Sequence, residues 1–234
     1  MIWIKDNQGG CTYKCQMNTP IVRQPPGCQH PDWKDHWESI YAEKNPAEVS
    51  WYQSHPQHSL SLIGDTGIGT TASIIDVGGG ASTLVDHLLM EGYRDITVLD
   101  IARSAIEQAE NRLGDRSQQV TWVESDVTSY APGQTFDIWH DRAVFHFLTL
   151  EHDRECYLKT LNKALKPGGH VIIATFSDSG PNQCSGLDVV RYSPEALSQA
   201  LGPTLRLAEI LTENHHPPSG GLQQFVYCRF SRNA

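Results

Sequence analysis

The chain has 234 residues, of which 39% are hydrophobic and 19% charged, a balance typical of one folded domain with a buried core. Eighteen lysines and arginines against 27 aspartates and glutamates give a net charge of −9, which argues against a nucleic-acid partner held mainly through its phosphates. No apolar run approaches the roughly 20 residues that cross a bilayer, and Lys5 and Asp6 come too early for a secretory signal. We therefore expect a cytoplasmic protein, monomeric or homodimeric, with no membrane or nucleic-acid partner.

Residues 1–30 show no hydrophobic period and are rich in glycine, glutamine and proline, which predicts a loosely ordered extension before a domain over 31–234. Four residues of metal-binding type lie in the extension: Cys11, Cys15, Cys28 and His30. Their spacing is only loosely like that of a four-ligand zinc site, and incidental thiols explain it more simply. No metal site is predicted.

The first helix is expected to begin at Pro31, because several apolar residues there share one face at helical spacing. Those residues are Trp33, Trp37, Ile40 and Tyr41. From residue 72 onward, short apolar runs alternate with helical stretches. The runs predict strands at 73–77, 95–100, 120–123, 136–139 and 171–176, and then near 204–211 and 223–230 after a helix at 194–201. This order is typical of a doubly wound α/β domain with a terminal hairpin.

Helix ends are also marked in the sequence. Gly92 and Gly114 are placed to end the second and third helices, and residues 104–107 have the pattern of a capping box. The segment 167–169, Pro-Gly-Gly, is expected to stop the helix before the fifth strand.

A glycine-rich turn, residues 78–80, follows the first predicted strand and would let the backbone approach a ligand closely. The dinucleotide pattern needs a third glycine where Thr83 stands. Asp76, Asp100 and Asp126 lie at the carboxyl ends of three successive parallel strands, the edge where ligands of open α/β sheets bind. Three acids without a lysine or arginine at the turn favour a cofactor that lacks phosphates.

These segments, 76–82, 98–100 and 126–127, resemble the class I S-adenosylmethionine-dependent methyltransferases. Asp137 and the segment 165–169 add to the resemblance, which covers roughly residues 33 to 230. It implies a seven-stranded, Rossmann-like sheet whose last strand is antiparallel, and S-adenosyl-L-methionine as the cofactor.

The resemblance also assigns roles to individual residues. Asp76, with Gly78 and Gly80, would cradle the methionine end of the cofactor. At the end of the second strand, Asp100 would take the ribose hydroxyls and Ile101 would lie against the adenine. After the third strand, Asp126 would bond the adenine amino group, helped by the backbone of Val127.

The aromatic residues Trp37, Tyr41 and Trp51 are similar to the N-terminal cap of a subgroup that includes lysine methyltransferases of elongation factor 1A and of citrate synthase. In that subgroup the matching positions line the cofactor pocket. A sulfonium cation is attracted to aromatic faces by roughly 0.5–2 kcal/mol per contact, which gives the resemblance a physical reason.

The segment 139–148, in contrast, is similar to the Trp-Asp-Arg segment of thiopurine and related small-molecule thiol methyltransferases. We therefore predict a small-molecule methyl acceptor with a thiol, chalcogen or amine nucleophile. The alternative is a protein lysine, as in the subgroup with the aromatic cap.

A general base is expected on the loop after the fourth strand if the nucleophile arrives protonated. His146 is the first candidate because histidine titrates in the useful range, followed by Asp141 and then His140. His140 is also counted with the cofactor-binding residues. The competing interpretation is that Asp141 only pairs with Arg142 or contacts the cofactor, and that His146 faces the following helix.

Two other classes of function remain open. A nicotinamide-dependent oxidoreductase would account for the glycine turn and Asp100, but Thr83 counts against it. A non-catalytic cofactor-binding module would keep the fold and lose turnover.

Overall fold

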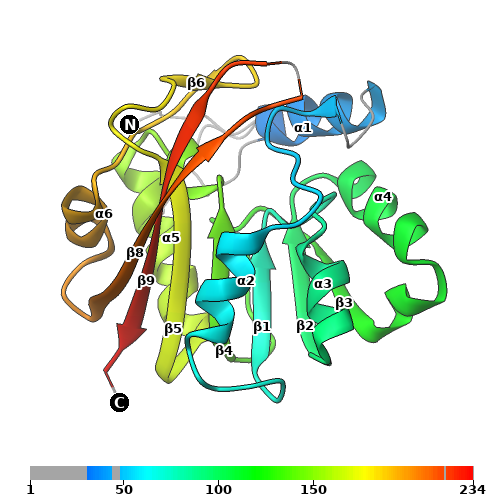
Figure 1. Ribbon diagram of the computed structural model, residues 1–234, viewed down its shortest axis with the longest axis horizontal. Coiled ribbons are helices and arrows are strands. Elements are labelled where there is room, and N and C mark those ends of the chain that lie inside the picture. Colours follow the sequence, from blue (N-terminus) through cyan, green and yellow to red (C-terminus); the bar gives the residue numbers. More distant parts are fainter. Residues whose placement is uncertain (1–30, 44–47, 219, 234) are drawn as a thin grey trace, which may run out of the picture.

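The computed structural model describes residues 31–43, 48–218 and 220–233, so the predictions for residues 1–30, including the four cysteine and histidine residues there, lie outside the described residues. The described chain is built around one seven-stranded sheet with the strand order β3-β2-β1-β4-β5-β9-β8. The strands are β1 (Ser73–Val77), β2 (Asp95–Asp100), β3 (Val120–Glu124), β4 (Phe136–Arg142), β5 (Leu165–Phe176), β8 (Leu205–His215) and β9 (Gln223–Arg232). Figure 1 shows this sheet with helices on both faces.

The first five strands run parallel, and β9 is antiparallel to both of its neighbours, β5 and β8. The last strand is therefore inserted antiparallel between two strands of the opposite direction. This confirms the predicted fold class, a doubly wound α/β sheet of the class I methyltransferase type.

The described chain has six α-helices that connect the strands or cover the sheet: α1 (Pro31–Glu43), α2 (Gln57–Gly64), α3 (Leu84–Glu91), α4 (Arg103–Leu113), α5 (Glu151–Ala164) and α6 (Pro194–Leu201). Figure 1 shows α2 and α3 in front of the sheet and α5 behind it. Two short 3-10 helices, η2 (Gly114–Gln119) and η3 (Phe145–Phe147), and a small hairpin of β6 (Gln183–Cys184) and β7 (Leu187–Asp188) complete the described elements. None of the described helices is long and apolar enough to cross a membrane.

Alternation along the buried strands divides the core between the two faces of the sheet. Ile74 packs with α2 and α3, whereas its neighbour Ile75 packs with α5 and α6. Burying both faces explains why these strands read as continuous apolar runs rather than as alternating ones.

The predicted bounds of β1, β2 and α6 match those of the structure. Gly92 ends α3 in the left-handed conformation, with φ at 100°, and Gly114 is the C-cap of α4, as predicted. The capping box at 104–107 does not begin α4, whose N-cap is Ala102. The helix instead receives its cap from α1, because the Glu38 carboxylate accepts the backbone N–H groups of Arg103 and Ser104 at 2.7 and 3.0 Å.

Several strands are longer than predicted, and for β4 and β5 the difference moves candidate site residues or a predicted helix stop into a strand. β4 continues to Arg142, so His140 and Asp141 lie within the strand and not on a loop after it. β5 begins at Leu165 and takes in the Pro-Gly-Gly segment at 167–169, which coincides with an irregular register between β4 and β5. Neither α2 nor the hairpin of β6 and β7 was predicted from the sequence.

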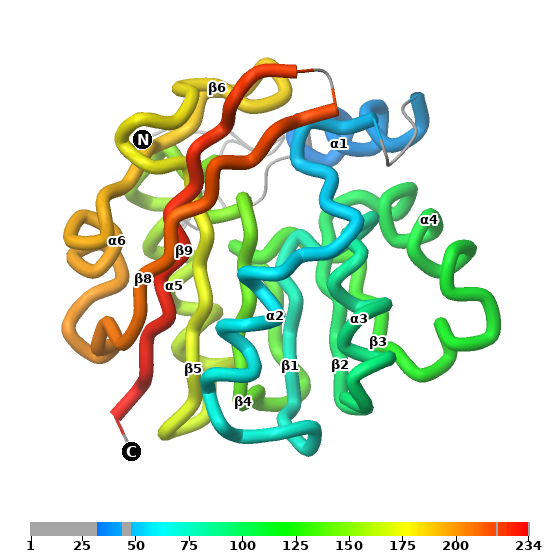
Figure 2. Tube along the Cα trace, viewed as in Figure 1, coloured from blue at the N-terminus to red at the C-terminus, as the bar shows by residue number. Residues whose placement is uncertain are grey.

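The path of the chain in Figure 2 brings α1, the hairpin of β6 and β7 and the ends of β8 and β9 over one edge of the sheet. The parallel strands present their carboxyl ends at this edge. The candidate site lies there.

Candidate functional site

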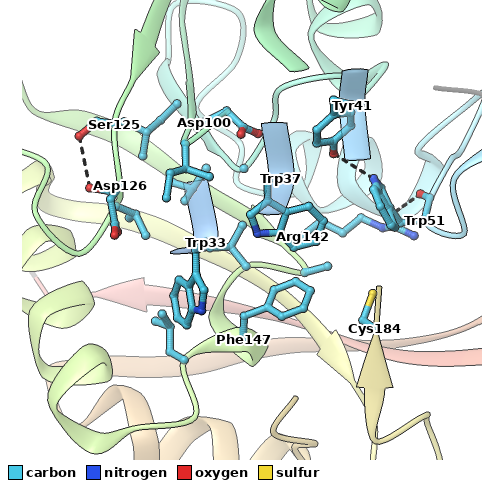
Figure 3. A pocket seen from close by; sticks show the side chains of 18 of the residues that line it. Trp33, Trp37, Tyr41, Trp51, Asp100, Ser125, Asp126, Arg142, Phe147 and Cys184 are labelled. Carbon is cyan, nitrogen blue, oxygen red and sulfur yellow. Dashed lines mark hydrogen bonds between the residues drawn. The ribbon is translucent and has the colours of Figure 1, made fainter. Parts of the chain in front are cut away.

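Two adjoining cavities lie at the carboxyl edge of the sheet, and Tyr41, Trp51, Gly78 and Arg142 line both of them. The first cavity extends over β2 and β3 and, on its other side, toward β6 and β9. The second lies beside the glycine turn between β1 and α3. In Figure 3, Asp126 and Cys184 mark opposite sides of the first cavity.

Asp100, the last residue of β2, is held by two backbone donors. Its Oδ1 accepts the N–H of Ala102 at 2.9 Å and its Oδ2 accepts the N–H of Gly80 at 3.0 Å. Burial raises the pKa of this carboxyl to about 6. A Cβ on Gly80 would lie 2.5 Å from both Asp100 Oδ2 and Ala105 Cβ, so only glycine allows this approach. Each carboxylate oxygen keeps a lone pair for a ligand hydroxyl.

Asp126, just after β3, lines the first cavity and has one carboxylate oxygen without a partner. Its Oδ1 accepts both the N–H and the hydroxyl of Thr128, at 2.8 and 2.6 Å. Its Oδ2 is buried and has no hydrogen-bond partner. Since a buried carboxylate oxygen without a donor is costly, this atom fits a ligand that brings an N–H group.

Asp76, in β1, has the same arrangement at the second cavity. Its Oδ1 accepts the Nδ1–H of His140 at 2.7 Å, and the other ring nitrogen of His140 lies 2.8 Å from Ser59 Oγ. The Oδ2 of Asp76 is buried without a partner. A Cβ on Gly79 would lie 2.4 Å from this oxygen, so the glycine turn passes directly against it.

Aromatic rings from α1 and the segment after it cover the first cavity (Figure 3). The Trp37 ring centroid lies 5.7 Å from that of Trp51 and 5.2 Å from that of Phe147. Trp51 Nε1 donates to the Tyr41 hydroxyl at 3.2 Å. The capping of α4 by Glu38 holds α1 in this position.

The side of the first cavity that faces away from Asp126 is formed by different residue types. Figure 3 places Arg142 and Cys184 there, and the lining of the cavity also includes Ala143, Val144, Phe147 and Phe225. Burial raises the pKa of the Cys184 thiol to about 11, so the thiol is protonated at neutral pH. No carboxylate from the described residues lines this side.

The structure does not bring the three candidate bases together at a cavity. His140 lines the second cavity, but both of its ring nitrogens already have partners. Asp141 and His146 line neither cavity and are fully buried. His140 and Asp141 lie within β4, which extends to Arg142, so their side chains point to opposite faces of the sheet. On the expected loop they could have pointed the same way.

Asp141 and His146 are tied into the fold. Asp141 accepts the hydroxyl of Tyr157 at 2.6 Å and the N–H of Val144 at 2.9 Å, and burial raises the pKa of its carboxyl to about 6. His146 Nδ1 accepts the N–H of Phe176 at 3.4 Å, and burial lowers the pKa of its ring to about 3. A general base must reach the proton that it removes, and neither residue lines either cavity.

Most of the predicted cofactor residues do lie along the cavities. Trp37, Tyr41, Trp51, Gly78, Asp100, Ile101, Asp126 and Val127 line the first, and Asp76 and His140 line the second. Gly80 lines neither but donates to Asp100.

Some residues that line the cavities were not predicted from the sequence: Trp33, Ser59, Ser125, Phe147 and Phe225. The spacing of Trp33 from Trp37 was a usable signal, because it places both rings on one face of α1. The other four carried no signal that separates them from core residues.

The donors and acceptors present fit the cofactor that the resemblance implies. The buried free oxygens of Asp126 and Asp76 match an adenine amino group and an ammonium group, and Asp100 matches a ribose diol. Arg142 is the one lysine or arginine among the described residues that lines the cavities, so a pyrophosphate has no set of cations to hold it. Within the described residues no cluster of three or more histidines, cysteines or acids is placed to hold a metal ion.

Comparisons with known proteins agree with this assignment. Residues 75–171 match the sequence family described as "Methyltransferase domain". The chain is 25% identical over 139 residues to the "eEF1A lysine and N-terminal methyltransferase" of Mus musculus, covering 59% of this chain and 20% of that protein. It is also 25% identical over 123 residues to "Nodulation protein S" of Rhizobium tropici, covering 53% of this chain and 51% of that protein. The chain thus spans between a fifth and about half of the length of these relatives.

A solved structure with the same fold is the N-methyltransferase NodS from Bradyrhizobium japonicum in complex with S-adenosyl-L-homocysteine. It has a TM-score of 0.67 at 19% identity and covers 86% of this chain and 98% of that chain. Sheet order, the glycine turn and the family match point to the same conclusion. Residues 75–171 match a methyltransferase domain, and the described chain has the fold of the class I S-adenosylmethionine-dependent methyltransferases.

Proposed function

We propose that this protein transfers the methyl group of S-adenosylmethionine to a small-molecule nucleophile, a thiol, chalcogen or amine. The observation that carries the choice of acceptor is the side of the first cavity away from Asp126, where aromatic and sulfur side chains and one arginine occur without a carboxylate from the described residues. Acidic walls would be expected around a channel that admits a cationic lysine.

Cofactor binding would use the three strand ends. Asp126 Oδ2 would accept the adenine amino group, Asp100 the ribose hydroxyls, and Asp76 Oδ2 the ammonium of the amino-acid end. When bound, S-adenosylmethionine supplies an electrophilic methyl group on a sulfonium. Trp37 and Trp51 line the cavity near these strand ends, and their faces would attract that positive charge.

The role of the protein in the transfer step would be alignment. Holding the nucleophile about 3 Å from the methyl group and in line with the bond that breaks supplies much of the rate. Arg142, Phe147 and Phe225 form the surface against which an acceptor would be held. Because Asp141 and His146 are buried away from the cavities, we do not assign them the removal of a proton. A thiol or chalcogen nucleophile is already partly deprotonated near neutral pH, so it can react without a base from the protein.

A protein lysine is the second candidate acceptor. Two observations favour it: the aromatic cover of Trp37, Tyr41 and Trp51, and relatives named as eEF1A lysine methyltransferases. Against it stands Arg142, whose positive charge would repel a lysine ammonium at the same side of the cavity.

The test is incubation with methyl-labelled S-adenosylmethionine, offered in parallel to a panel of small thiols, chalcogen anions and amines and to an undermethylated cell lysate. We expect label in a small, extractable product. An Asp100→Ala variant should lose transfer, while Asp95→Asn, at the opposite end of the same strand, should retain it. Label fixed in a single protein band would replace the proposal with the lysine alternative.

A further inference from the structure

The Arg142 guanidinium is fixed in an unusual setting at the boundary of the two cavities. Arg142 ends β4, its side chain is 12% exposed, and it lines both cavities. Its Nε donates to the Tyr227 hydroxyl at 2.8 Å and its Nη1 to the Trp51 carbonyl oxygen at 2.9 Å. The guanidinium carbon lies 4.7 Å from the centroid of the Phe225 ring. Three contacts, two from β9 and one from the segment at Trp51, thus hold the group in one orientation, and Figure 3 shows Arg142 beside Trp51.

The guanidinium nevertheless keeps unused donors. Two of its five N–H groups take part in these hydrogen bonds. Nη2 is buried and has no hydrogen-bond partner among the described residues. Buried donors of a charged group are costly to leave unpaired, so their presence beside a cavity points to a ligand that supplies an acceptor.

The nearest carboxylate does not satisfy Arg142. Glu213 Oε2 lies 3.8 Å from Nη2, beyond hydrogen-bond distance, and already accepts the Tyr227 hydroxyl at 2.7 Å. Its Oε1 accepts the side-chain amide of Gln53. Glu213 lines neither cavity, so it lies behind the guanidinium and leaves the positive charge facing the ligand space.

The groups around this charge are weakly polar. Phe147, Cys184 and Phe225 line the cavity beside it. Burial raises the pKa of the Cys184 thiol although the charge of Arg142 acts in the opposite direction, which indicates that the guanidinium acts on this side of the cavity. In such surroundings an ion pair is screened less than in water.

We propose that Arg142 is a receptor for a single carboxylate. One planar guanidinium matches one carboxylate, and the described lining offers no second lysine or arginine, as a phosphate dianion would favour. Because Arg142 lines both cavities, the carboxylate has two sources. It belongs either to the amino-acid end of the cofactor or to the methyl acceptor. In the second case this inference rests on the proposed function, and it narrows the acceptor to molecules that bear a carboxylate.

The first experiment tests for a carboxylate preference in the wild-type protein and needs no variant. Titration calorimetry compares S-adenosylhomocysteine with its decarboxylated analogue, which lacks only the carboxylate. Ligand-detected NMR then compares benzoate with benzamide on the protein saturated with S-adenosylhomocysteine. We expect the carboxylate-bearing member of one pair to bind at least about tenfold more tightly. A preference in the first pair assigns the carboxylate to the cofactor, and a preference in the second assigns it to the acceptor.

Variants then connect the preference to the residue. Arg142→Met should abolish it, and Arg142→Lys should keep part of it, because lysine retains the charge without the planar fork. Arg206→Met, an exposed arginine on β8, is the matched control and should change neither pair. The inference is overturned if the wild type shows no carboxylate preference in either pair, or if the preference survives in Arg142→Met. That result would leave the proposed function standing, whereas a wild type that does not bind S-adenosylhomocysteine would overturn both.

Discussion

His140 Nδ1 lies 2.7 Å from Asp76 Oδ1, and this hydrogen bond fixes one carboxylate oxygen while the other, Oδ2, stays buried without a partner beside the glycine turn. Ser59 Oγ, 2.8 Å from His140 Nε2, extends the chain of contacts to α2. Three elements, β1, β4 and α2, therefore hold the free oxygen of Asp76 in place.

From this arrangement we predict that Asp76→Asn weakens the binding of S-adenosylhomocysteine about 10- to 100-fold, because a charge-assisted hydrogen bond to the ammonium is lost. The deaminated analogue, which has no ammonium, should bind both proteins within about threefold of each other. Titration calorimetry of the two ligands against wild type, Asp76→Asn and the exposed control Asp95→Asn is the measurement. An equal loss for both ligands would show that Asp76 acts through the fold and not through the ammonium.

We predict that a substitution at Asp126 changes which base the site prefers. Its free Oδ2 accepts an N–H group, so the wild type should prefer the adenine of S-adenosylhomocysteine to the hypoxanthine of S-inosylhomocysteine by about tenfold or more. In Asp126→Asn the amide can donate to the hypoxanthine oxygen, while the amide oxygen keeps the contacts to Thr128. The preference should shrink or reverse, as competition between the two ligands would show. An unchanged preference would place the base elsewhere.

Asp100 predicts the pH dependence of cofactor binding. Burial raises the pKa of its carboxyl to about 6, so the group gains a proton as the pH falls through that value and becomes a weaker acceptor for hydroxyls. The affinity for S-adenosylhomocysteine should be constant above about pH 7 and fall by up to tenfold per unit below about pH 6. Circular dichroism at each pH separates this loss from unfolding. Asp100→Asn should bind more weakly throughout and lose the pH dependence; retention of the dependence would assign it to another group.

Much of this site follows from the sequence because it depends on strand ends. Asp76, Asp100 and Asp126 each belong to or directly follow an apolar run, and parallel strands bring their carboxyl ends to one edge whatever their exact pairing. The glycine turn could also be recognised from the sequence. Only residues without a side chain allow the close approach of this turn to Asp76 and Asp100.

The opposite side of the cavity could not be predicted, because it depends on where distant segments return. Phe225 reaches Arg142 through β9, which enters the sheet antiparallel beside β5 after almost fifty intervening residues. The position of His146 depended on where β4 ends, and element boundaries are the least certain part of a pattern. The extra residues in β4 turned two expected loop residues into strand residues on opposite faces.

Asp141 has a structural role that predicts a specific loss of stability. Tyr157 donates to Asp141 Oδ2 at 2.6 Å and accepts from Trp139 Nε1 at 2.8 Å, all in the buried core. Tyr157→Phe leaves the Nε1–H of Trp139 without an acceptor and removes one of the two donors to Asp141 Oδ2, so we expect a loss of about 1–3 kcal/mol in the free energy of unfolding. Urea unfolding measures it, with the half-buried Tyr130→Phe as the control that changes little.

The same variant tests the role of Asp141 in turnover. If the carboxylate only anchors η3 through the N–H groups of Val144 and Phe145, methyl transfer per folded molecule should change less than about threefold in Tyr157→Phe. A shift in the pH profile of the rate without a loss of stability would instead make Asp141 a proton acceptor.

His146 makes the fold sensitive to acid. Burial lowers the pKa of its ring to about 3, below the value of about 6.5 in an unfolded chain. Below about pH 6.5 the unfolded chain binds a proton that the folded protein does not, so stability is lost as the pH falls from there toward 3. At pH 5 the difference of 1.5 pKa units corresponds to about 2 kcal/mol.

We therefore predict a smaller effect of acid on the variant His146→Asn. Between pH 7 and pH 5 its free energy of unfolding should fall by about 2 kcal/mol less than that of the wild type. Asparagine keeps an acceptor for the N–H of Phe176, since its amide oxygen takes the position of Nδ1. The exposed control His55→Asn should leave the slope unchanged. Because the ring lines neither cavity, turnover of His146→Asn between about pH 6 and 9 should stay within about threefold of wild type. A turnover that collapses while the protein stays folded would return His146 to the mechanism as a base that reaches the acceptor in another conformation.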